Sequence, residues 1–445
     1  MNALVSAPAA PAELLLREAH LLDPRTGLDT PGDLLVREGT IAEIGAPGSL
    51  PAPPGAETVQ ARGRHVLPAF FDPHVHLRTP GDEREEDLET GTRAAAAGGF
   101  CAVVAMPNTR PTTDSPIVLG ALRELAGRDA RIPVGFMPAI TCGLDGAQLT
   151  DMAEMRALGA LGFTDDGRPV QSAGLLRRAL QYQRLCGGVL ALHEEDPSLS
   201  AGGSMHEGEV AALLGIAGIA SVSESTMVAR DCALAGYEDA RIHIQHVSAQ
   251  ETLAALETAK AAGVRVTAEA SPHHLLLSDE DVRGLDTRRK MNPPLRAPAD
   301  REAIVQALRS GLLDCVATDH APHHRDEKEV PFEQAAFGTT GLETAFAAIY
   351  TGLVLPGMLP LELLVHRMTA GAELLELPVP TLAPGAPANL TLVDLDAEWV
   401  VGEPGYESRS ENCAFAGQRL RGRVRLTVAA GAVAYRERAF ALSAA

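Results

Sequence analysis

The sequence lacks the features that mark a secreted or membrane-bound chain. Its six cysteines are scattered, and no two form a Cys-x-x-Cys pair, which predicts reduced thiols in a cytosolic protein. No stretch approaches the roughly 18 uninterrupted apolar residues of a spanning helix. The opening segment MNALVSAPAAPAELLL has no positively charged start, and prolines interrupt its apolar part. We therefore expect no signal peptide and a cytoplasmic location.

Positive charge is also scarce. The chain has 38 Lys and Arg against 58 Asp and Glu, which gives a net charge of −20 at pH 7. This balance argues against nucleic acid or an anionic membrane as a partner. A small anionic substrate stays open, because a local basic pocket can exist in an acidic protein. The hydrophobic fraction of 46% and the charged fraction of 22% are those of a globular protein with a substantial core.

Apolar runs and helical stretches alternate along the middle of the chain. Eight runs are predicted strands: HVLPAFFDPHVHL, FCAVVAMPN, IPVGFMPAI, ALGFTDD, GVLALHEE, RIHIQHVS, VRVTAEASPHH and DCVATDHAPHH. Strands that are each followed by a helix predict an α/β fold, a (β/α)8 TIM-like barrel. Short alternating strands at both ends predict one small β-sandwich built from both termini. We expect the barrel at residues 66–377 and the sandwich at 1–65 and 378–445.

Histidines and aspartates gather at the ends of these predicted strands. In FDPHVHLRTPG, His74 and His76 occupy alternate positions of a strand, so their imidazoles face the same side. Such a pair alone is a weak signal, because it often consists of two hydrogen-bonded side chains. The other polar residues that end strands are Asn108, Asp165, Asp166, His193, His246 and Asp319. Because barrels of this type keep their active sites at that face, the agreement favours a metal site.

Four imidazoles and two carboxylates form the predicted metal site: His74, His76, His193, His246, Asp166 and Asp319. Nitrogen and oxygen ligands without thiolate suit Zn²⁺, with Mn²⁺ or Co²⁺ as substitutes. One open catalytic zinc needs only about three protein ligands. Six ligands suit two metals about 3.5–4 Å apart with a shared carboxylate, so we expect two Zn²⁺ per chain. Asp165 is expected to support a turn or the ligands rather than to bind metal.

The chain resembles the amidohydrolase superfamily over nearly its whole length, and especially bacterial class I dihydroorotases. Nine motifs between residues 72 and 344 carry this resemblance. They are DPHVHLRTPG, AMPNTRP, GFTDDGRPVQ, ALHEED, HIQHVSA, ASPHHL, KMNPPLR, ATDHAPH and AAFGTTGLET. The resemblance implies a reversible zinc-dependent hydrolysis of (S)-dihydroorotate to N-carbamoyl-L-aspartate, in de novo pyrimidine (UMP) biosynthesis. It implies a first metal on His74 and His76, a second on His193 and His246, and Asp166 as the bridge. Asp319 would bind the first metal and, as the catalytic residue, carry the proton.

The resemblance also implies a pocket for a small-molecule substrate. Its contacts would come from Arg78, Asn108, Asn292 and His323, and from Phe337 and Gly338 through backbone groups. A salt bridge with a neighbouring acid, such as Asp82, is the structural alternative for Arg78. The polar, glycine-ended segment 325–341 is predicted to act as a lid. The family leans toward a homodimer, and association with aspartate transcarbamoylase stays open.

Two other functions are alternatives. Related enzymes that open hydantoins, dihydropyrimidines or allantoin use a carboxylated lysine as the metal bridge, and GFTDDG has no lysine. An inactive scaffold subunit for aspartate transcarbamoylase should have lost metal ligands, whereas all six are present.

The sequence also gives two structural expectations. His243, at odd spacing from His246, should face away from the site, and the acidic run GDEREEDLE at 81–89 should be a solvated loop and helix start.

Overall fold

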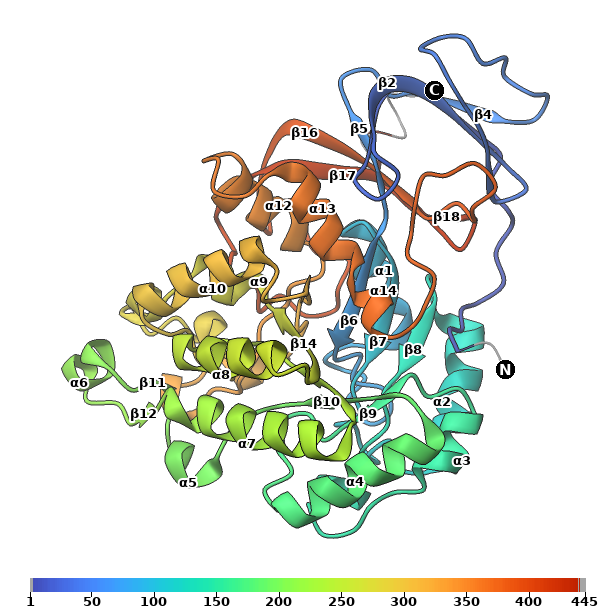
Figure 1. The fold of residues 1–445 in the computed structure, drawn as a ribbon. Coiled ribbons are helices and arrows are strands. Elements are labelled where there is room, and N and C mark those ends of the chain that lie inside the picture. Colours follow the sequence, from blue (N-terminus) through green and yellow to red (C-terminus); the bar gives the residue numbers. More distant parts are fainter. Residues whose placement is uncertain (1–2, 439, 441–445) are drawn as a thin grey trace.

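Eight parallel strands form a barrel at the centre of the protein. In the computed structural model, which describes residues 3–438 and 440, they are β6 (Phe70–Val75), β7 (Phe100–Ala105), β8 (Val134–Phe136), β9 (Gly162–Thr164), β10 (Val189–Leu192), β13 (Arg241–Ile244), β14 (Arg265–Ala270) and β15 (Cys315–Val316) (Figure 1). Hydrogen bonds order them as β6-β7-β8 and β9-β10-β13-β14-β15. Two contacts close the ring. Leu161 N donates to Phe136 O at 3.0 Å, and Val75 pairs with His320 in a parallel bridge.

Helices surround this barrel. The longer ones are α1 (Leu88–Ala97), α2 (Pro116–Asp129), α4 (Ala173–Cys186), α7 (Val222–Glu238), α8 (Gln250–Ala261), α10 (Pro298–Ser310) and α13 (Leu361–Thr369). Short helices lie between them: α3 (Met152–Ala157), α5 (Pro197–Ser200), α6 (Glu209–Leu214), α9 (Pro272–Leu276), α11 (Arg325–Lys328), α12 (Ala345–Ile349) and α14 (Gly371–Leu374). A two-stranded ribbon, β11 (Met205–His206) and β12 (Gly218–Ile219), flanks α6. The local sequence sets where helices begin: the Asp87 side chain accepts a hydrogen bond from Thr90 N at the start of α1.

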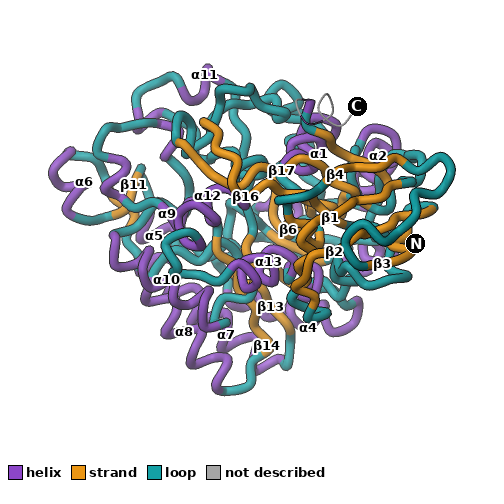
Figure 2. The backbone as a smooth tube through the Cα atoms, turned by 90° about the horizontal axis from the view of Figure 1, so that it is seen from above, coloured by secondary structure: helices purple, strands orange, loops and turns teal. Residues whose placement is uncertain are grey.

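Strands from both ends of the chain form a second layer. They are β1 (Leu14–Asp23), β2 (Leu28–Arg37), β3 (Thr40–Gly45), β4 (Glu57–Gln60), β5 (His65–Pro68), β16 (Leu390–Val400), β17 (Arg419–Ala429) and β18 (Ala432–Arg436). They join in one sheet of order β18-β17-β16-β5-β1-β2-β3, with β4 beside β1. A core of its own, with Leu16, Val36 and Leu392 fully buried, packs within it. Figure 2 shows β1 to β3 right of the centre of the view, and α7 and α8 toward its lower left.

The fold prediction is confirmed: an α/β barrel is joined to a small β-domain built from both termini. The first predicted strand divides at Ala69, because β5 pairs with β1 and β16 whereas β6 enters the barrel. The domain limits at 65/66 and 377/378 stay predictions, and residues 1–2, 439 and 441–445 lie outside the described residues. Over the part of the chain that the structure describes, no helix combines the length and hydropathy needed to cross a membrane.

We predict that Phe70→Ala destabilises the protein by about 3–5 kcal/mol, because it empties a buried aromatic site. The Phe70 ring is fully buried, stacks on Phe346 at 5.2 Å and meets Phe100 edge-on at 5.7 Å. Urea unfolding followed by circular dichroism measures the change. Ile117→Ala, at a side chain that is 84% exposed, is the control and should leave the midpoint unchanged. Equal midpoints for both variants would contradict the role of this cluster.

Candidate active site

The first cluster of candidate ligands forms where β6 meets the segment after β15. His74 and His76 are 0% and 6% exposed, and Asp319 is 7% exposed. His76 Nε2 lies 3.1 Å from Asp319 Oδ1, and His74 Nε2 lies 3.5 Å from the same oxygen. One ligand atom from each of the three residues can be chosen so that all lie within 4.8 Å of one another. The structure therefore brings residues from the first and the last barrel strand together at one spot.

The second cluster shares Asp166 with the first. Asp166 Oδ1 lies 3.5 Å from His74 Nε2, 3.6 Å from His193 Nδ1 and 3.8 Å from His246 Nε2. Its other oxygen lies 3.5 Å from His76 Nε2. Asp166 thus stands between the two histidine pairs, the position that a bridging ligand needs. All six predicted ligands converge on one buried spot.

Backbone conformation aims several of these side chains. Arg78, His246 and Asp319 have φ values of 55°, 31° and 47°, in the left-handed region that residues other than glycine rarely adopt. Each follows the end of a barrel strand, where the change of direction turns the side chain toward the mouth of the barrel. Such conformations carry a free-energy cost of about 1–3 kcal/mol each and gather at functional sites.

Two observations test whether this cluster fits a metal. First, His74 Nε2, the ring nitrogen that faces Asp166 and Asp319, is buried without a hydrogen-bond partner among the described residues, although buried polar atoms normally have one. Second, burial disfavours a charged imidazole, yet the carboxylates of Glu269, Asp166 and Asp319 outweigh burial and raise the pKa of His74 well above its usual value. The negative charge that stabilises a proton on His74 would also stabilise a divalent cation. The imidazole and carboxylate ligand atoms are those that Zn²⁺ prefers. The residues fit the metal.

A pocket of about 250 Å³ opens beside these ligands. It is lined by His76, Arg78, Asn108, Asp166, Gly167, His193, His246, Asn292, Asp319, Ala321, His323 and Phe337. Five of the six predicted substrate contacts are therefore in the lining. Gly338 is outside it but borders His323, because a Cβ added at Gly338 would lie 3.0 Å from His323 Cδ2. The size suits one small cyclic molecule in contact with the ligand cluster.

Arg78 supplies the positive charge of this pocket. Its side chain is 12% exposed, and its Nε lies 3.2 Å from Glu85 Oε2 and donates to Pro322 O at 3.0 Å. Its Nη2 lies 3.2 Å from His323 Nε2. The acid beside Arg78 is therefore Glu85 and not Asp82, whose carboxylate instead lies 3.6 Å from Arg110. Burial raises the pKa of Glu85 to about 7 against the opposing effect of Arg78.

The acidic run 81–89 matches its prediction in part. It contains the start of α1, capped by Asp87, as expected. Glu85 and Glu86, however, are 7% and 0% exposed, so the run is not simply a solvated loop. Glu86 lies 3.3 Å from His320 Nε2 and accepts hydrogen bonds from Ser408 and Thr90. Several partners of these acids come from segments far along the chain, which the local charge pattern does not reveal.

His243 also differs from its prediction, because it supports the site instead of facing away. Its Nε2 donates to Glu269 Oε2 at 2.9 Å, and Glu269 Oε1 accepts from His74 Nδ1 at 2.7 Å. We expected His243 and His246 to point in opposite directions because side chains alternate along a strand. The left-handed conformation of His246 breaks this alternation. A carboxylate on the second nitrogen of a ligand histidine fixes its ring and tautomer.

Glu195 is a further site residue that the sequence reasoning missed. Its Oε2 accepts from His193 Nε2 at 3.3 Å and from Asn292 Nδ2 at 2.5 Å, so one carboxylate orients a predicted ligand and a predicted substrate contact. Its place in ALHEED, two residues after His193, was the available signal. Among the described residues, Asp165 has no hydrogen bond to a member of either cluster. It accepts from Ile140 N and Thr141 N at 2.8 and 2.9 Å and holds a neighbouring loop.

The chain is similar to proteins of a known family over nearly its full length. A family model described as "Dihydro-orotase-like" matches residues 63–252. The dihydroorotase of Pelotomaculum thermopropionicum is 44% identical over 96% of this chain and 99% of that protein. The dihydroorotase of Geobacter metallireducens is 42% identical over 95% of this chain and 99% of that protein.

Solved structures show the same architecture. The L-hydantoinase (dihydropyrimidinase) from Arthrobacter aurescens superposes with a TM-score of 0.84, at 26% identity, over 95% of this chain and 96% of that one. A dihydropyrimidinase from Brevibacillus agri superposes with a TM-score of 0.82, at 21% identity, over 95% of both chains, which shows the shared fold. Identity is markedly higher to the dihydroorotases, and it extends over nearly the full length. The chain belongs to the dihydroorotase family.

Proposed function

We propose that this protein is a dihydroorotase, which hydrolyses (S)-dihydroorotate reversibly to N-carbamoyl-L-aspartate in pyrimidine biosynthesis. The observation that carries the proposal is the buried Arg78 guanidinium in the same 250 Å³ pocket as the ligand cluster. A cyclic amide that bears a ring carboxylate needs both an anion partner and a hydrolytic centre. Arg78 can pair with a carboxylate through two parallel N–H donors.

The cofactor we propose is a pair of zinc ions, for which Mn²⁺ or Co²⁺ could substitute. His74, His76 and Asp319 would hold one ion, His193 and His246 the other, and Asp166 would join them. When bound, such ions make water nucleophilic near neutral pH and polarise an amide carbonyl. Glu269 and Glu195 hold the rings of His74 and His193 in orientation from behind.

Asp319 is the residue we propose for proton transfer. It lies at the boundary between the ligand cluster and the substrate pocket, in reach of both. It would accept a proton from the attacking water and deliver it to the ring nitrogen as the amide bond breaks. The reverse sequence closes the ring, which is the direction that pyrimidine synthesis requires.

The remaining pocket residues would orient the substrate. Arg78 and Asn108 would hold the carboxylate, and Asn292, His323 and the backbone at Phe337 and Gly338 would contact the ring. Asn108 also accepts from His76 Nδ1 at 2.9 Å and donates to Asp166 at 3.1 Å, so substrate position and ligand geometry are coupled. Fixed orientation makes the attack effectively unimolecular.

A hydantoinase-like activity is the second candidate, because solved hydantoinases share the fold. Asp166 at the bridging position and the charged Arg78 pocket favour the dihydroorotase. We further propose that the protein is a cytoplasmic homodimer. Co-purification would test whether it also associates with aspartate transcarbamoylase.

We predict that the protein turns over L-dihydroorotate but neither hydantoin nor dihydrouracil, measured by ring opening in ultraviolet absorbance. Arg78→Met should lower kcat/KM for dihydroorotate about 10- to 150-fold, because a charge-assisted hydrogen bond is lost. Arg128→Met, at a side chain 70% exposed on α2, is the matched control. Turnover of the neutral rings in preference to dihydroorotate would refute the proposed substrate.

We predict that Asp319→Asn lowers kcat by about 10²–10⁴-fold, since the amide cannot accept the proton. Single-turnover kinetics with zinc-loaded protein gives the rate of the chemical step, and elemental analysis shows whether metal is retained. Asp145→Asn, at an exposed loop aspartate, should behave as the unchanged protein. Near-normal turnover by the zinc-loaded Asp319→Asn variant would contradict the assigned role.

We predict that chelator-treated protein takes up about two equivalents of Zn²⁺ and that His246→Ala takes up about one. Calorimetric titration and elemental analysis measure this without reference to activity. His20→Ala, in the terminal sheet, should still bind as many ions as the unchanged protein. A single equivalent in the unchanged protein would rule out the two-metal arrangement.

A further inference from the structure

Two buried lysines stand beside the segment that brings Phe337 and Gly338 to the pocket. The chain has only three lysines among its 38 basic residues, namely Lys260, Lys290 and Lys328. Lys290 and Lys328 are 2% and 4% exposed. Within the described residues neither has a carboxylate oxygen within 4.0 Å, so both ammonium groups are held by other partners.

Those partners are backbone carbonyls of the segment. Lys328 Nζ donates to Ala336 O at 2.7 Å, to Gly338 O at 2.9 Å and to Lys290 O at 3.2 Å, which uses all three of its protons. Lys290 Nζ donates to Phe332 O and Glu333 O at 2.9 and 3.0 Å. It also lies 4.4 Å from the centre of the Phe337 ring. The two side chains thus bind the backbone on both sides of Phe337.

Gly338 is fixed from several directions. Its N–H donates to Lys290 O at 2.9 Å, and its carbonyl accepts from Lys328 and from Asn412 Nδ2, the latter at 3.2 Å. Its φ is 142°, and a Cβ added here would lie only 2.8 Å from Ala321 Cβ, so glycine alone suits this position. His323 Nε2 donates to the adjacent Phe337 O at 2.8 Å. The backbone of 336–338 therefore has one defined path across the pocket.

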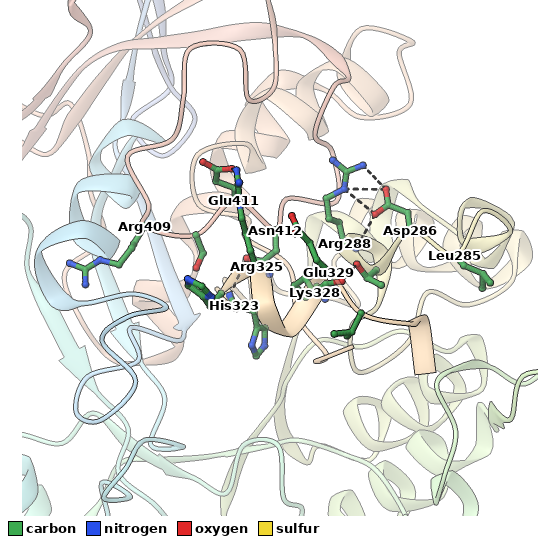
Figure 3. A pocket seen from close by; sticks show the side chains of 14 residues that line it. Leu285, Asp286, Arg288, His323, Arg325, Lys328, Glu329, Arg409, Glu411 and Asn412 are labelled. Carbon is green, nitrogen blue, oxygen red and sulfur yellow. Dashed lines mark hydrogen bonds and ion pairs between the residues drawn. The ribbon is translucent and has the colours of Figure 1, made fainter. Parts of the chain in front are cut away.

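A second hollow, of about 620 Å³, borders the beginning of the 325–338 segment. It is lined by His323–Arg325, Lys328–Val330, Leu285–Arg288 and Arg409–Asn412. Figure 3 shows these side chains, with Lys328 drawn between His323 and Arg288. His323 lines both this hollow and the 250 Å³ pocket. The segment thus borders two open spaces, one at Arg325 and Lys328–Val330 and the other at Phe337.

Lysine suits this task better than arginine. An ammonium is a compact group with three donors, which can point at three converging carbonyls, whereas a guanidinium is a planar fork. Burying it is unfavourable, and burial together with the nearby charge of Lys290 lowers the pKa of Lys328 to about 7. In a chain that otherwise uses arginine almost throughout, two of the three lysines occupy these positions.

We propose that Lys328, assisted by Lys290, is a positioning residue that fixes the backbone of 332–338 and thereby holds Phe337 in a preformed position in the lining of the substrate pocket. The segment predicted to be a lid is therefore latched in place before substrate arrives. This inference rests on the proposed function for its kinetic effect, since Phe337 and Gly338 are substrate contacts there. The hydrogen bonds from the two lysines to the backbone, which form the latch, can be tested by hydrogen exchange without measuring turnover.

The test is Lys328→Met, which keeps the length of the side chain and removes its three donors. We expect KM for dihydroorotate to rise about tenfold with kcat changed by less than about threefold, because binding groups lose their fixed position while the ligand cluster is untouched. Hydrogen exchange followed by mass spectrometry should show faster exchange in peptides covering 329–340. Metal content should stay that of the unchanged protein.

Lys260→Met is the matched control, because Lys260 lies on α8 and binds Asp314 and Leu312 O, away from the pocket. It should leave both KM and exchange at 329–340 unchanged. Lys290→Met releases the carbonyls of Phe332 and Glu333 and removes the charge over the Phe337 ring. It should show the same changes to a smaller extent, and it carries the test if Lys328→Met does not fold. Unchanged exchange at 329–340 in both variants, or a loss of kcat at constant KM, would overturn the proposal. Failure of the unchanged protein to open dihydroorotate would refute the proposed function and leave the exchange result to decide on the latch.

Discussion

The closing contact between the first and last barrel strands is the interaction on which the site depends. His76 N donates to His320 O at 2.9 Å, next to the Val75–His320 bridge. The fully buried Asp72 strengthens this contact, because its carboxylate accepts from Thr318 Oγ1 at 2.6 Å and from His74 N at 3.1 Å. As a result His76 and Asp319, 243 positions apart in the chain, lie within hydrogen-bond distance. Without closure, the ligands of the first cluster would belong to separate edges of an open sheet.

Burying so many polar groups at one spot shapes the surroundings of the site. Carboxylates and imidazoles that leave water need compensating partners, and a second ring of side chains supplies them. Glu269 links His74 to His243, and Glu195 links His193 to Asn292. Lys290 and Lys328 likewise donate hydrogen bonds to backbone carbonyls of the segment that carries Phe337 at the substrate pocket. The site is therefore rigid through hydrogen bonds as much as through apolar packing, which is what fixed geometry in catalysis requires.

The predictions succeeded where the signal was periodic and local. Each barrel strand is a short apolar run with a polar end, and its period and length are visible in a single stretch of sequence. They failed at His243 and at the acidic run 81–89, for two reasons. The orientation of His243 relative to His246 depends on a left-handed residue that breaks strand alternation. The burial of Glu85 and Glu86 depends on Arg78, His320 and Ser408, which local charge counting cannot take into account.

The sequence by itself determined the order of strands and helices, the union of both termini in one small domain, and the chemical identity of the candidate ligands. It did so because apolar runs, strand alternation and family motifs are visible in short stretches of sequence, and the alternating strands at both ends differ from the barrel pattern between them. Only the tertiary structure decided which acid faces Arg78, which carboxylates orient the histidines, and that two rare lysines hold the wall of the pocket. Those contacts join residues 7, 195 and 10 positions apart through the curvature of a closed barrel and the path of one loop. No local pattern specifies such a path, because it results from the simultaneous packing of the whole chain.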